Sequence, residues 1–195
     1  PTEITILGAS KRRTTLEVQA ASELGLRCFG ENYVPELVSK ALELPQLEWH
    51  FIGHLQRNKV RKLVPHISML HTLDSVRLAD AVNAASERLS VLIQVNIGGE
   101  ASKTGCSIEE AGTVARHVQA KCPQLALKGL MCIPPPGLDP IPFYQELAAS
   151  RDQLQDSLGS SLPTLSMGMS GDVEQAIQCG ATIVRVGTAL FGPRD

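Results

Sequence analysis

The stretch ITILGASKRR, residues 4–13, decides how the chain is organised. Its first six residues form a short apolar run that is typical of a buried strand. Ser10 and three basic residues follow, and an amphipathic helical pattern then begins at residue 15. The stretch therefore predicts a strand, a loop and a helix in succession, with Lys11 at the point where the strand ends.

The same unit recurs along the whole chain. Further apolar runs predict strands at 27–30, 49–53, 67–72, 90–97, 125–133, 162–167 and 182–187. Helical patterns lie between the strands at 15–25, 33–43, 56–64, 75–87, 108–121, 141–158 and 172–179. Strict alternation predicts right-handed parallel βαβ units, and eight strands favour a closed (β/α)8 TIM barrel in a single domain over residues 1–195.

The competing fold is a doubly wound open sheet. That fold would need fewer strands, and no GxGxxG sequence follows the first strand. One detail of the barrel prediction is awkward, because few residues follow the eighth strand and we expect no eighth helix. We expect the seam between the last and first strands to be covered by an N-terminal helix outside this sequence, or by a partner surface.

The helical stripe is clearest in the first predicted helix. Leu16, Ala20, Ala21 and Leu24 recur at helical spacing, and the stripe ends at Gly25, which predicts a helix that stops there.

Composition narrows the class of protein. Aromatic residues make up only 4% of the 195 residues, which predicts an aliphatic core like that of α/β folds. The net charge of −2 gives no global attraction to nucleic acid, and no apolar run approaches the ~20 residues of a membrane span. The five scattered cysteines, without a CxxC pair, predict reduced and mostly buried thiols in a cytoplasmic protein.

The carboxyl ends of barrel strands are where active residues gather, so the residues after each predicted strand are the candidates. The loop after strand seven, LSMGMSGD, and the loop after strand eight, RVGTALFG, have small residues whose backbone N–H groups can approach a phosphate. Ser170, Gly187 and Thr188 are the expected phosphate ligands. Alternatively, Ser170 only caps the seventh helix. The charge of Asp172 must point away from any bound phosphate.

Lys11 supplies the second chemical group of the predicted site. A lysine amine in a barrel mouth can form a Schiff base with an aldehyde or ketone. We expect Lys11 to face the phosphate loops across the barrel, an arrangement that suits a phosphorylated aldehyde. Pyridoxal phosphate and the sugar phosphate of an aldolase both fit at this point. The alternative is that Lys11 is a surface lysine beside Arg12 and Arg13.

Eight blocks of the sequence resemble one known family. In order they are GASKRR, CFGENYVPEL, WHFIGHLQRNKV, HTLDS, IQVNIGGEASKTG, LKGLMCI, LSMGMSGDVEQAI and TIVRVGTALFG. They resemble the pyridoxal-phosphate homeostasis proteins, a single-domain barrel family related to the N-terminal domain of alanine racemase. The resemblance covers residues 4–194.

The resemblance implies a role for each matching residue. Lys11 is the Schiff-base lysine, and Ser170, Gly187 and Thr188 are phosphate ligands. Arg185 faces the pyridine nitrogen, while Asn32 and Met169 lie beside the ring. Arginine is always protonated and has no acceptor, so it does not favour protonation of that nitrogen and weakens the ring as an electron sink.

The resemblance further implies a non-catalytic protein that controls vitamin B6 homeostasis and the balance of amino and keto acids. Racemisation needs acid–base groups on both faces of the substrate carbon. Tyr33 and Tyr144 are the only tyrosines, and neither is placed as a second base. A weak pyridoxal-phosphate-dependent racemase remains the alternative, and a Schiff-base aldolase is a third class. The expected partners are the cofactor and apo forms of enzymes that use it, and we expect a monomer.

Three features remain outside this scheme. Lys103 is a candidate secondary acceptor, with a solvated loop lysine as its alternative. His50 and His54 have i, i+4 spacing, but they lie on a strand and its loop without a third ligand, so no metal site is expected. The basic run at 57–62 lacks aromatic residues, which favours a solvated helix face over an RNA-binding surface.

Overall fold

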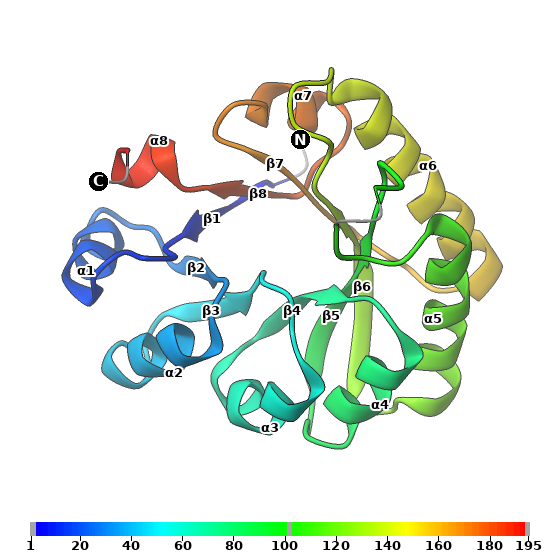
Figure 1. Cartoon of the computed structure of the whole chain (residues 1–195), viewed down its shortest axis with the longest axis horizontal. Helices are drawn as coiled ribbons and strands as arrows, with labels where there is room; N and C mark the ends of the chain where they lie inside the picture. The colour runs from blue at the N-terminus through cyan, green and yellow to red at the C-terminus, as the bar shows by residue number, and fades with distance from the viewer. Residues whose placement is uncertain (1–2, 101–102, 194–195) are drawn as a thin grey trace.

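The computed structural model describes residues 3–100 and 103–193, and its centre is a closed barrel of parallel strands (Figure 1). The strands follow one another around the barrel in chain order, and β1 pairs with β8 to close it. The strands are β1 (Thr5–Ala9), β2 (Cys28–Glu31), β3 (Glu48–Phe51), β4 (Met69–Leu73), β5 (Leu89–Val95), β6 (Leu125–Cys132), β7 (Thr164–Met169) and β8 (Ile183–Val186). The barrel prediction is confirmed, and each strand begins and ends within two residues of its predicted bounds.

Helices surround the barrel, as Figure 1 shows. They are α1 (Thr15–Glu23), α2 (Val34–Glu43), α3 (Val60–Leu63), α4 (Val76–Asn83), α5 (Ile108–Lys121), α6 (Ile141–Leu158), α7 (Val173–Gln178) and α8 (Thr188–Phe191). Short 3-10 turns at Arg57–Lys59 and Val64–His66 flank α3, where the sequence predicts one continuous helix. Pro65 accounts for the second interruption, since it has no N–H to continue the α-helical ladder.

The core consists of two regions. The larger region lies between the strands and the helices and is mainly aliphatic, as composition predicts. The smaller region lies inside the barrel and contains Leu7, Cys28 and Ile183, with Ile52 and Met69 packed against them. The interior also holds buried polar side chains, among them His50, His71, Ser166 and Arg185. A barrel interior with this much polarity needs specific partners for each group, because an unpaired buried polar atom is costly.

The predicted helix α1 is present, but the leucines of its stripe do not face the barrel. Leu16 and Leu24 are 76% and 91% exposed, whereas Val18, Ala21 and Ser22 are buried. Ile6, on the outer side of β1, is also half exposed at 51%. Periodicity alone cannot distinguish a stripe that packs on the barrel from one that faces away from it.

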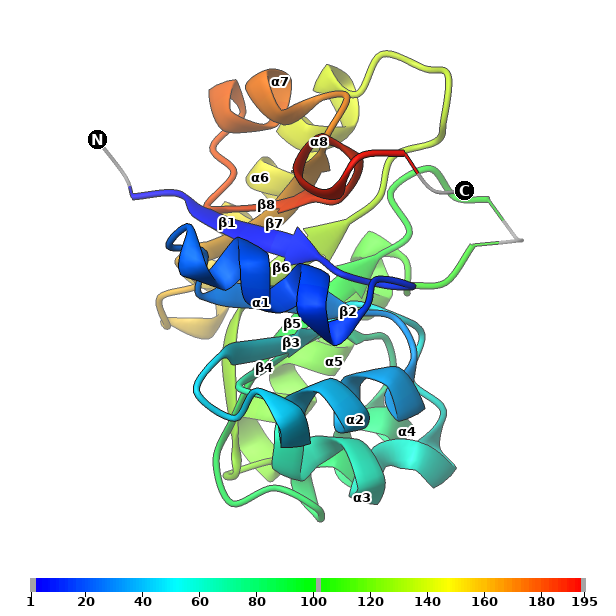
Figure 2. The same cartoon turned by 90° about the vertical axis from the view of Figure 1, so that its left-hand side faces the viewer.

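The seam between β1 and β8 also differs from its prediction. A single helical turn, α8, follows β8, where the sequence predicts no eighth helix. Figure 2 shows β1 running alongside β8, with α8 close to both strands. The exposed Ile6 indicates that α8 does not cover the outer side of β1. The expectation of an N-terminal helix or partner over this seam stays a prediction.

The structure bears on the cysteines and on the lack of a membrane span, both of which the sequence addressed. All five cysteines are free thiols, and four of them are buried, as predicted. Burial raises the pKa of Cys106 and of Cys132 to about 12, so these thiols are protonated at neutral pH. Among the described residues, every helix is too short or too polar to cross a bilayer.

Candidate functional site

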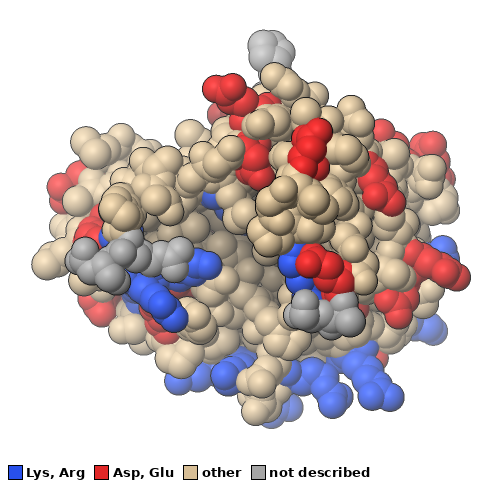
Figure 3. Space-filling view, turned by 45° about the horizontal axis from the view of Figure 1, so that its top comes forward, with Lys and Arg blue, Asp and Glu red and all other residues tan. Residues whose placement is uncertain are grey.

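A cavity of about 240 Å³ opens at the carboxyl ends of the strands. Its lining comes from loops far apart in the sequence: Ala9, Lys11, Arg13, Asn32, Ile52, Ile133, Met169, Ser170, Gly171, Arg185, Gly187 and Thr188. All seven residues predicted from the sequence are in this set. Figure 3 shows a hollow near the centre of one face, with basic side chains on either side of it.

The sequence prediction is wrong about where Lys11 lies relative to the phosphate loops. We expected the two to face each other across the barrel, but β1 and β8 are neighbours, with Leu7 opposite Arg185 in the register. Lys11 follows β1 directly, and Gly187 follows β8. The amine and the glycine loop therefore project from adjacent strands, because a closed barrel brings its first and last strands together.

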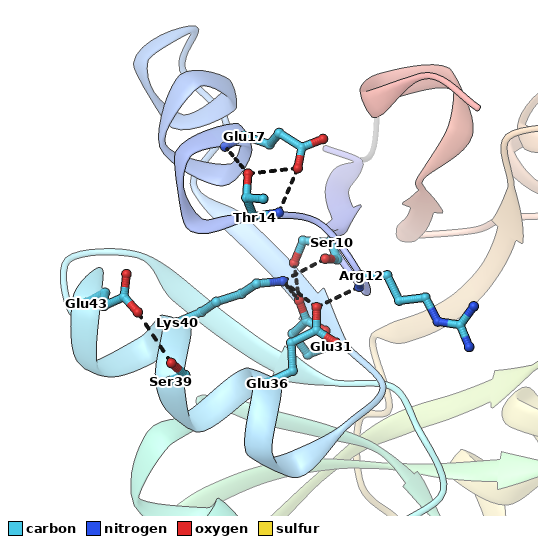
Figure 4. Close-up of polar contacts among 9 residues, drawn as sticks. All are labelled: Ser10, Arg12, Thr14, Glu17, Glu31, Glu36, Ser39, Lys40 and Glu43. Carbon is cyan, nitrogen blue, oxygen red and sulfur yellow. Dashed lines mark hydrogen bonds and ion pairs between the residues drawn. The ribbon is translucent and has the colours of Figure 1, made fainter. Parts of the chain in front are cut away.

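The turn that carries Lys11 is held in an unusual conformation. Arg12 has φ of 59°, in the left-handed region that residues with a Cβ rarely adopt. Its backbone N–H donates to Glu36 Oε1 at 2.6 Å, which ties the turn to α2. The strained residue directly after Lys11 is therefore fixed by a carboxylate from another element, as Figure 4 shows.

Beneath this turn lies a buried ionic cluster that we call the Lys40 network: Ser10, Glu31, Glu36 and Lys40 (Figure 4). Lys40 Nζ donates to Glu31 Oε1 at 2.6 Å and to Glu36 Oε1 at 2.7 Å. It also donates to the Ser10 carbonyl at 2.8 Å, and the Ser10 hydroxyl donates to Glu31 at 2.7 Å. Both flanks of Lys11 are thus tied to one buried ammonium group.

Burial dominates the electrostatics of this network. Glu31 is fully buried, and burial raises its pKa, although the hydrogen bonds from Lys40 and Ser10 act in the opposite direction. Its second oxygen, Oε2, has no hydrogen-bond partner among the described residues. The network is therefore held by charge pairing in a region that water does not screen.

The loops after β7 and β8 meet at one serine. Ser170 Oγ accepts from the backbone N–H groups of Gly187 and Ala189, at 3.4 and 3.3 Å. Ser170 therefore joins the two loops, and Asp172, rather than Ser170, occupies the N-cap position of α7. These loops offer a hydroxyl and backbone donors beside the cavity, which is what an anion requires.

Asp172 points away from the cavity, as the sequence analysis required. Its Oδ1 accepts from the Met169 N–H at 2.6 Å, and its Oδ2 accepts from the Tyr144 hydroxyl at 2.8 Å. Gly168 has φ of 92°, and a Cβ there would lie 2.5 Å from Ala176 Cβ. Only glycine lets β7 approach α7 this closely, so Gly168 sets the course of the loop that carries Ser170.

Arg185 lies at the base of the cavity and is almost fully buried. Its Nη1 donates to the carbonyl and hydroxyl oxygens of Ser166, at 2.7 and 2.8 Å. Its Nη2 donates to the Cys132 carbonyl at 2.8 Å. A guanidinium has five N–H donors, so these three bonds leave Nε–H and one hydrogen of Nη2 for a group in the cavity.

Two polar groups at the cavity have no partner in the described part of the chain, and they indicate whether an aldehyde-bearing ring with polar substituents fits the site. Asn32 Oδ1 is buried and has no hydrogen-bond partner among the described residues. Within residues 3–100 and 103–193, no hydrogen bond or ion pair engages the Lys11 ammonium. An orphaned acceptor and an unpaired amine on one cavity match such a ligand, because Asn32 lacks the partner that burial normally demands and the partly exposed amine is free to react. Met169 adds apolar surface and is partly exposed at the cavity.

Other candidates lie apart from this cavity. Lys103 Nζ pairs with Glu100 at 2.6 Å and donates to the Pro134 carbonyl, so it lines neighbouring hollows. Residues 101–102 of its predicted loop lie outside the described residues. His54 lies 3.8 Å from Asp74 and is not near His50's partners. The basic residues of the 57–62 run are exposed on the 3-10 turn Arg57–Lys59 and on α3, as expected of a solvated face.

His50 does not pair with His54, as their spacing could suggest, but lies among Cys28, Glu48 and His71. Its ring lies near Cys28 and Glu48, with ligand-type atoms within 4.8 Å of one another. Its two ring nitrogens already have partners, since Nε2 contacts Glu48 at 3.0 Å and Nδ1 contacts His71 at 2.9 Å. These contacts give His50 a place in a hydrogen-bonded chain.

The sequence analysis missed Lys40, His71 and Ser166. Lys40 had a detectable signal, because it lies three residues after Leu37 and so belongs to the apolar side of α2. No local pattern marks His71 and Ser166, which meet only when β4 and β7 face each other inside the barrel.

Comparisons with known proteins agree with this fold. A family model described as the alanine racemase N-terminal domain matches residues 11–195. Alanine racemase from Corynebacterium glutamicum has a similar barrel, with a TM-score of 0.79 at 15% identity, covering 98% of this chain and 56% of that one. The class defined by fold and site is therefore a barrel of the alanine racemase N-terminal type.

More similar relatives define the family within that class. Pyridoxal phosphate homeostasis proteins from Bos taurus and Escherichia coli are 45% and 43% identical, covering 97% and 100% of this chain and 77% and 88% of theirs. PipY from Synechococcus elongatus, solved with pyridoxal phosphate bound, is 32% identical with a TM-score of 0.91, covering 98% of this chain and 94% of that one. The chain belongs to the pyridoxal phosphate homeostasis protein family.

Proposed function

We propose that this chain binds pyridoxal 5'-phosphate in the cavity and controls its free concentration, without catalysing a reaction of its own. Residues 1–195 act as one binding domain in this proposal. The observation that carries it is the convergence of a free amine, an orphaned acceptor, a buried arginine and a serine–glycine loop on one cavity. The pyridoxal phosphate bound to PipY supports the choice of ligand.

Each residue would hold a different part of the cofactor. Lys11 Nζ would hold the aldehyde carbon of the cofactor as a Schiff base. Ser170, Gly187 and Thr188 donate to the phosphate, and Arg185 donates to the pyridine nitrogen. Asn32 and Met169 lie beside the ring. The cofactor supplies an electron-withdrawing ring, which Arg185 leaves weak because it offers the nitrogen no acidic proton.

The tyrosines support a role in binding rather than turnover. Tyr144 is fully buried, and burial together with Asp172 raises its pKa, so it is a poor proton carrier. Tyr33 is partly exposed at the N-cap of α2 and does not line the cavity. Neither hydroxyl is placed to exchange a proton at a carbon bound beside Lys11. Control of the cofactor, and with it the amino- and keto-acid balance, needs no such exchange.

A weak pyridoxal-phosphate-dependent racemase is the second candidate, and the match to the alanine racemase N-terminal domain favours it. Exchange of the α-proton of an amino acid distinguishes the two functions. A carrier gives exchange no faster than free cofactor, whereas a racemase gives catalytic exchange that Lys11→Ala abolishes. If bound cofactor passes to an apo-enzyme faster than this protein releases it spontaneously, the protein has a delivery role.

The attachment of the cofactor to Lys11 can be tested directly. We expect the absorbance band of an imine, its loss on borohydride reduction, and a modified Lys11 in peptide mass mapping. Lys11→Ala should abolish the band, while Lys103→Ala, the matched control, should retain it. A modified Lys103 in the parent protein would contradict the assignment.

The phosphate site has its own test. Ser170→Asp places a fixed negative charge where the phosphate should lie, so we expect loss of cofactor binding. Ser170→Ala removes only the hydroxyl and should weaken binding by roughly fivefold, the worth of one hydrogen bond. Equal dissociation constants for Ser170→Asp and the parent, measured by absorbance titration, would show that the phosphate lies elsewhere.

A further inference from the structure

A chain of polar side chains crosses the barrel interior beneath the cavity. Ser166 Oγ lies 2.9 Å from His71 Nδ1, and His71 Nε2 lies 2.9 Å from His50 Nδ1. His50 Nε2 then lies 3.0 Å from Glu48 Oε1. At the other end, Arg185 Nη1 donates to Ser166 Oγ at 2.8 Å. We call these four residues, Glu48, His50, His71 and Ser166, the Arg185 chain.

The contacts specify a direction for every hydrogen. Arg185 is only a donor, and an ionised Glu48 is only an acceptor, so both ends of the chain are fixed. Between them, Ser166 O–H can donate to His71 Nδ1, and His71 Nε2–H can donate to His50 Nδ1. His50 Nε2–H then donates to Glu48. Every nitrogen and oxygen in the path is satisfied once, with both histidines neutral.

We propose that the Arg185 chain positions the arginine for the cofactor, because its direction keeps the Ser166 hydroxyl oxygen presented to Arg185 Nη1. Glu48, at the opposite end of the barrel interior, is the group that sets this direction. The four residues act on the ligand only through Arg185, so they are positioning residues. The assignment deepens the proposed function, on which its ligand-binding consequences rest.

The opposite arrangement is electrostatically unfavourable. If His50 gained a proton, both its nitrogens would donate, and His71 Nδ1 would have to donate to Ser166. The Ser166 oxygen would then face two donors, His71 and Arg185, and its own hydrogen would lose its acceptor. Burial above all, with the charge of Arg185, holds the pKa of His71 well below its usual value, which supports a neutral ring.

The other groups that face the two rings are consistent with this state. Glu48 has a lowered pKa, chiefly because it accepts a hydrogen bond from His50, so it is ionised at neutral pH. Cys28 Sγ, from β2, lies 3.5 Å from His50 Nε2, and burial raises the pKa of this thiol. Glu48 is therefore the anion at the His50 end, and Arg185 is the cation at the other.

The direction of the chain can be measured without any ligand or variant. In long-range 1H–15N spectra of the labelled protein near neutral pH, we expect His50 and His71 to be neutral, with protonated Nε2 and unprotonated Nδ1. A protonated Nδ1 on either ring would overturn the assignment.

The consequence for the cofactor needs two variants and a control. Ser166→Ala and His71→Asn interrupt the chain, while Arg185 keeps its bonds to the Ser166 and Cys132 carbonyls. We expect roughly fivefold weaker binding of pyridoxal phosphate, the worth of one hydrogen bond, and a shifted absorbance spectrum of the bound cofactor. His117→Gln removes a histidine that pairs with Asp80 on the outside of the barrel and should change neither quantity.

The outcomes separate this inference from the proposed function. If both chain variants fold and match the parent in affinity and spectrum, the positioning role is wrong. If the parent protein binds no pyridoxal phosphate, the proposed function fails, and the tautomers still decide the direction of the chain. Should His71→Asn fail to fold, Ser166→Ala decides the matter, since it removes only one oxygen.

Discussion

The cavity is flanked by two polar clusters of different physical kinds. Beside Lys11, the Lys40 network holds one ammonium group between two carboxylates, with Lys40 and Glu31 almost fully buried. Beneath Arg185, the Arg185 chain holds two imidazoles and a hydroxyl between one cation and one anion. The first cluster depends on charge pairing and the second on the direction of hydrogen bonds. Removing a residue of the Lys40 network should therefore lower the stability of the protein, whereas removing a residue of the Arg185 chain should lower its affinity for the ligand.

The largest effect should come from Lys40→Met. This substitution leaves Glu31 and Glu36 without their cation in a buried site, and breaking a buried pair typically costs about 3–5 kcal/mol. Urea unfolding of the parent and the variant measures the loss of free energy. Lys62→Met, on the exposed face of α3, is the matched control and should be nearly neutral. A loss below about 1 kcal/mol for Lys40→Met would show that packing, and not charge, holds the network.

A change of pH should affect the two clusters in opposite directions. The pKa of Glu31 is raised in the folded protein above its ordinary value of 4.5. The contribution of Glu31 to stability therefore falls as the pH rises from 4.5 through its pKa in the folded protein. The pKa of Glu48 is lowered, so its contribution is present above 4.5 and falls as pH drops through the folded value.

Two glutamine variants isolate these contributions. Unfolding free energies of the parent, Glu31→Gln and Glu48→Gln should be measured between about pH 3 and pH 8. The parent's stability relative to Glu31→Gln should decrease as pH rises, and relative to Glu48→Gln it should increase. Parallel curves for parent and Glu31→Gln would mean that Lys40 cancels the effect of burial on Glu31.

The smallest effect should come from Glu43→Gln, on the same helix as Lys40. Ser39 donates to Glu43 at 3.3 Å with the i, i+4 spacing of Glu36 and Lys40, but this pair is exposed (Figure 4). We expect a change in unfolding free energy below about 0.5 kcal/mol, since water replaces the lost contact. A cost comparable to that of Lys40→Met would show that spacing, rather than burial, determines the strength of these pairs.

The sequence was informative wherever the relevant pattern was local. Strand and helix alternation predicted the barrel, and the residues at the ends of β1, β2, β7 and β8, together with the family resemblance, predicted seven members of the cavity lining. The stripe with Leu16 and Leu24 predicted α1 but not its buried face, because periodicity carries no information on which side the barrel lies. The placement of Lys11 was wrong because chain order was taken for distance, while closure makes β1 and β8 neighbours.

The polar support of the site could not be predicted in the same way. His71 and Ser166 are 95 positions apart, and their contact exists only inside the closed barrel. Lys40 had a recognisable position on the apolar side of α2, but its partners Ser10 and Glu31 come from two strand ends. Their roles depend on pairings between distant segments, which a single sequence does not display.

The pairing of β1 with β8 has a consequence for synthesis of the protein. Lys11 emerges from the ribosome long before Gly187 and Thr188, because the other six strands are made in between. Arg13, beside Lys11, donates to the Gly192 carbonyl across 179 positions, so the segments that follow β1 and β8 close the site together. Long-range contacts of this kind form slowly. A nascent chain would therefore carry an amine without its neighbouring phosphate loops, and the cavity would be complete only once translation had passed the last strand.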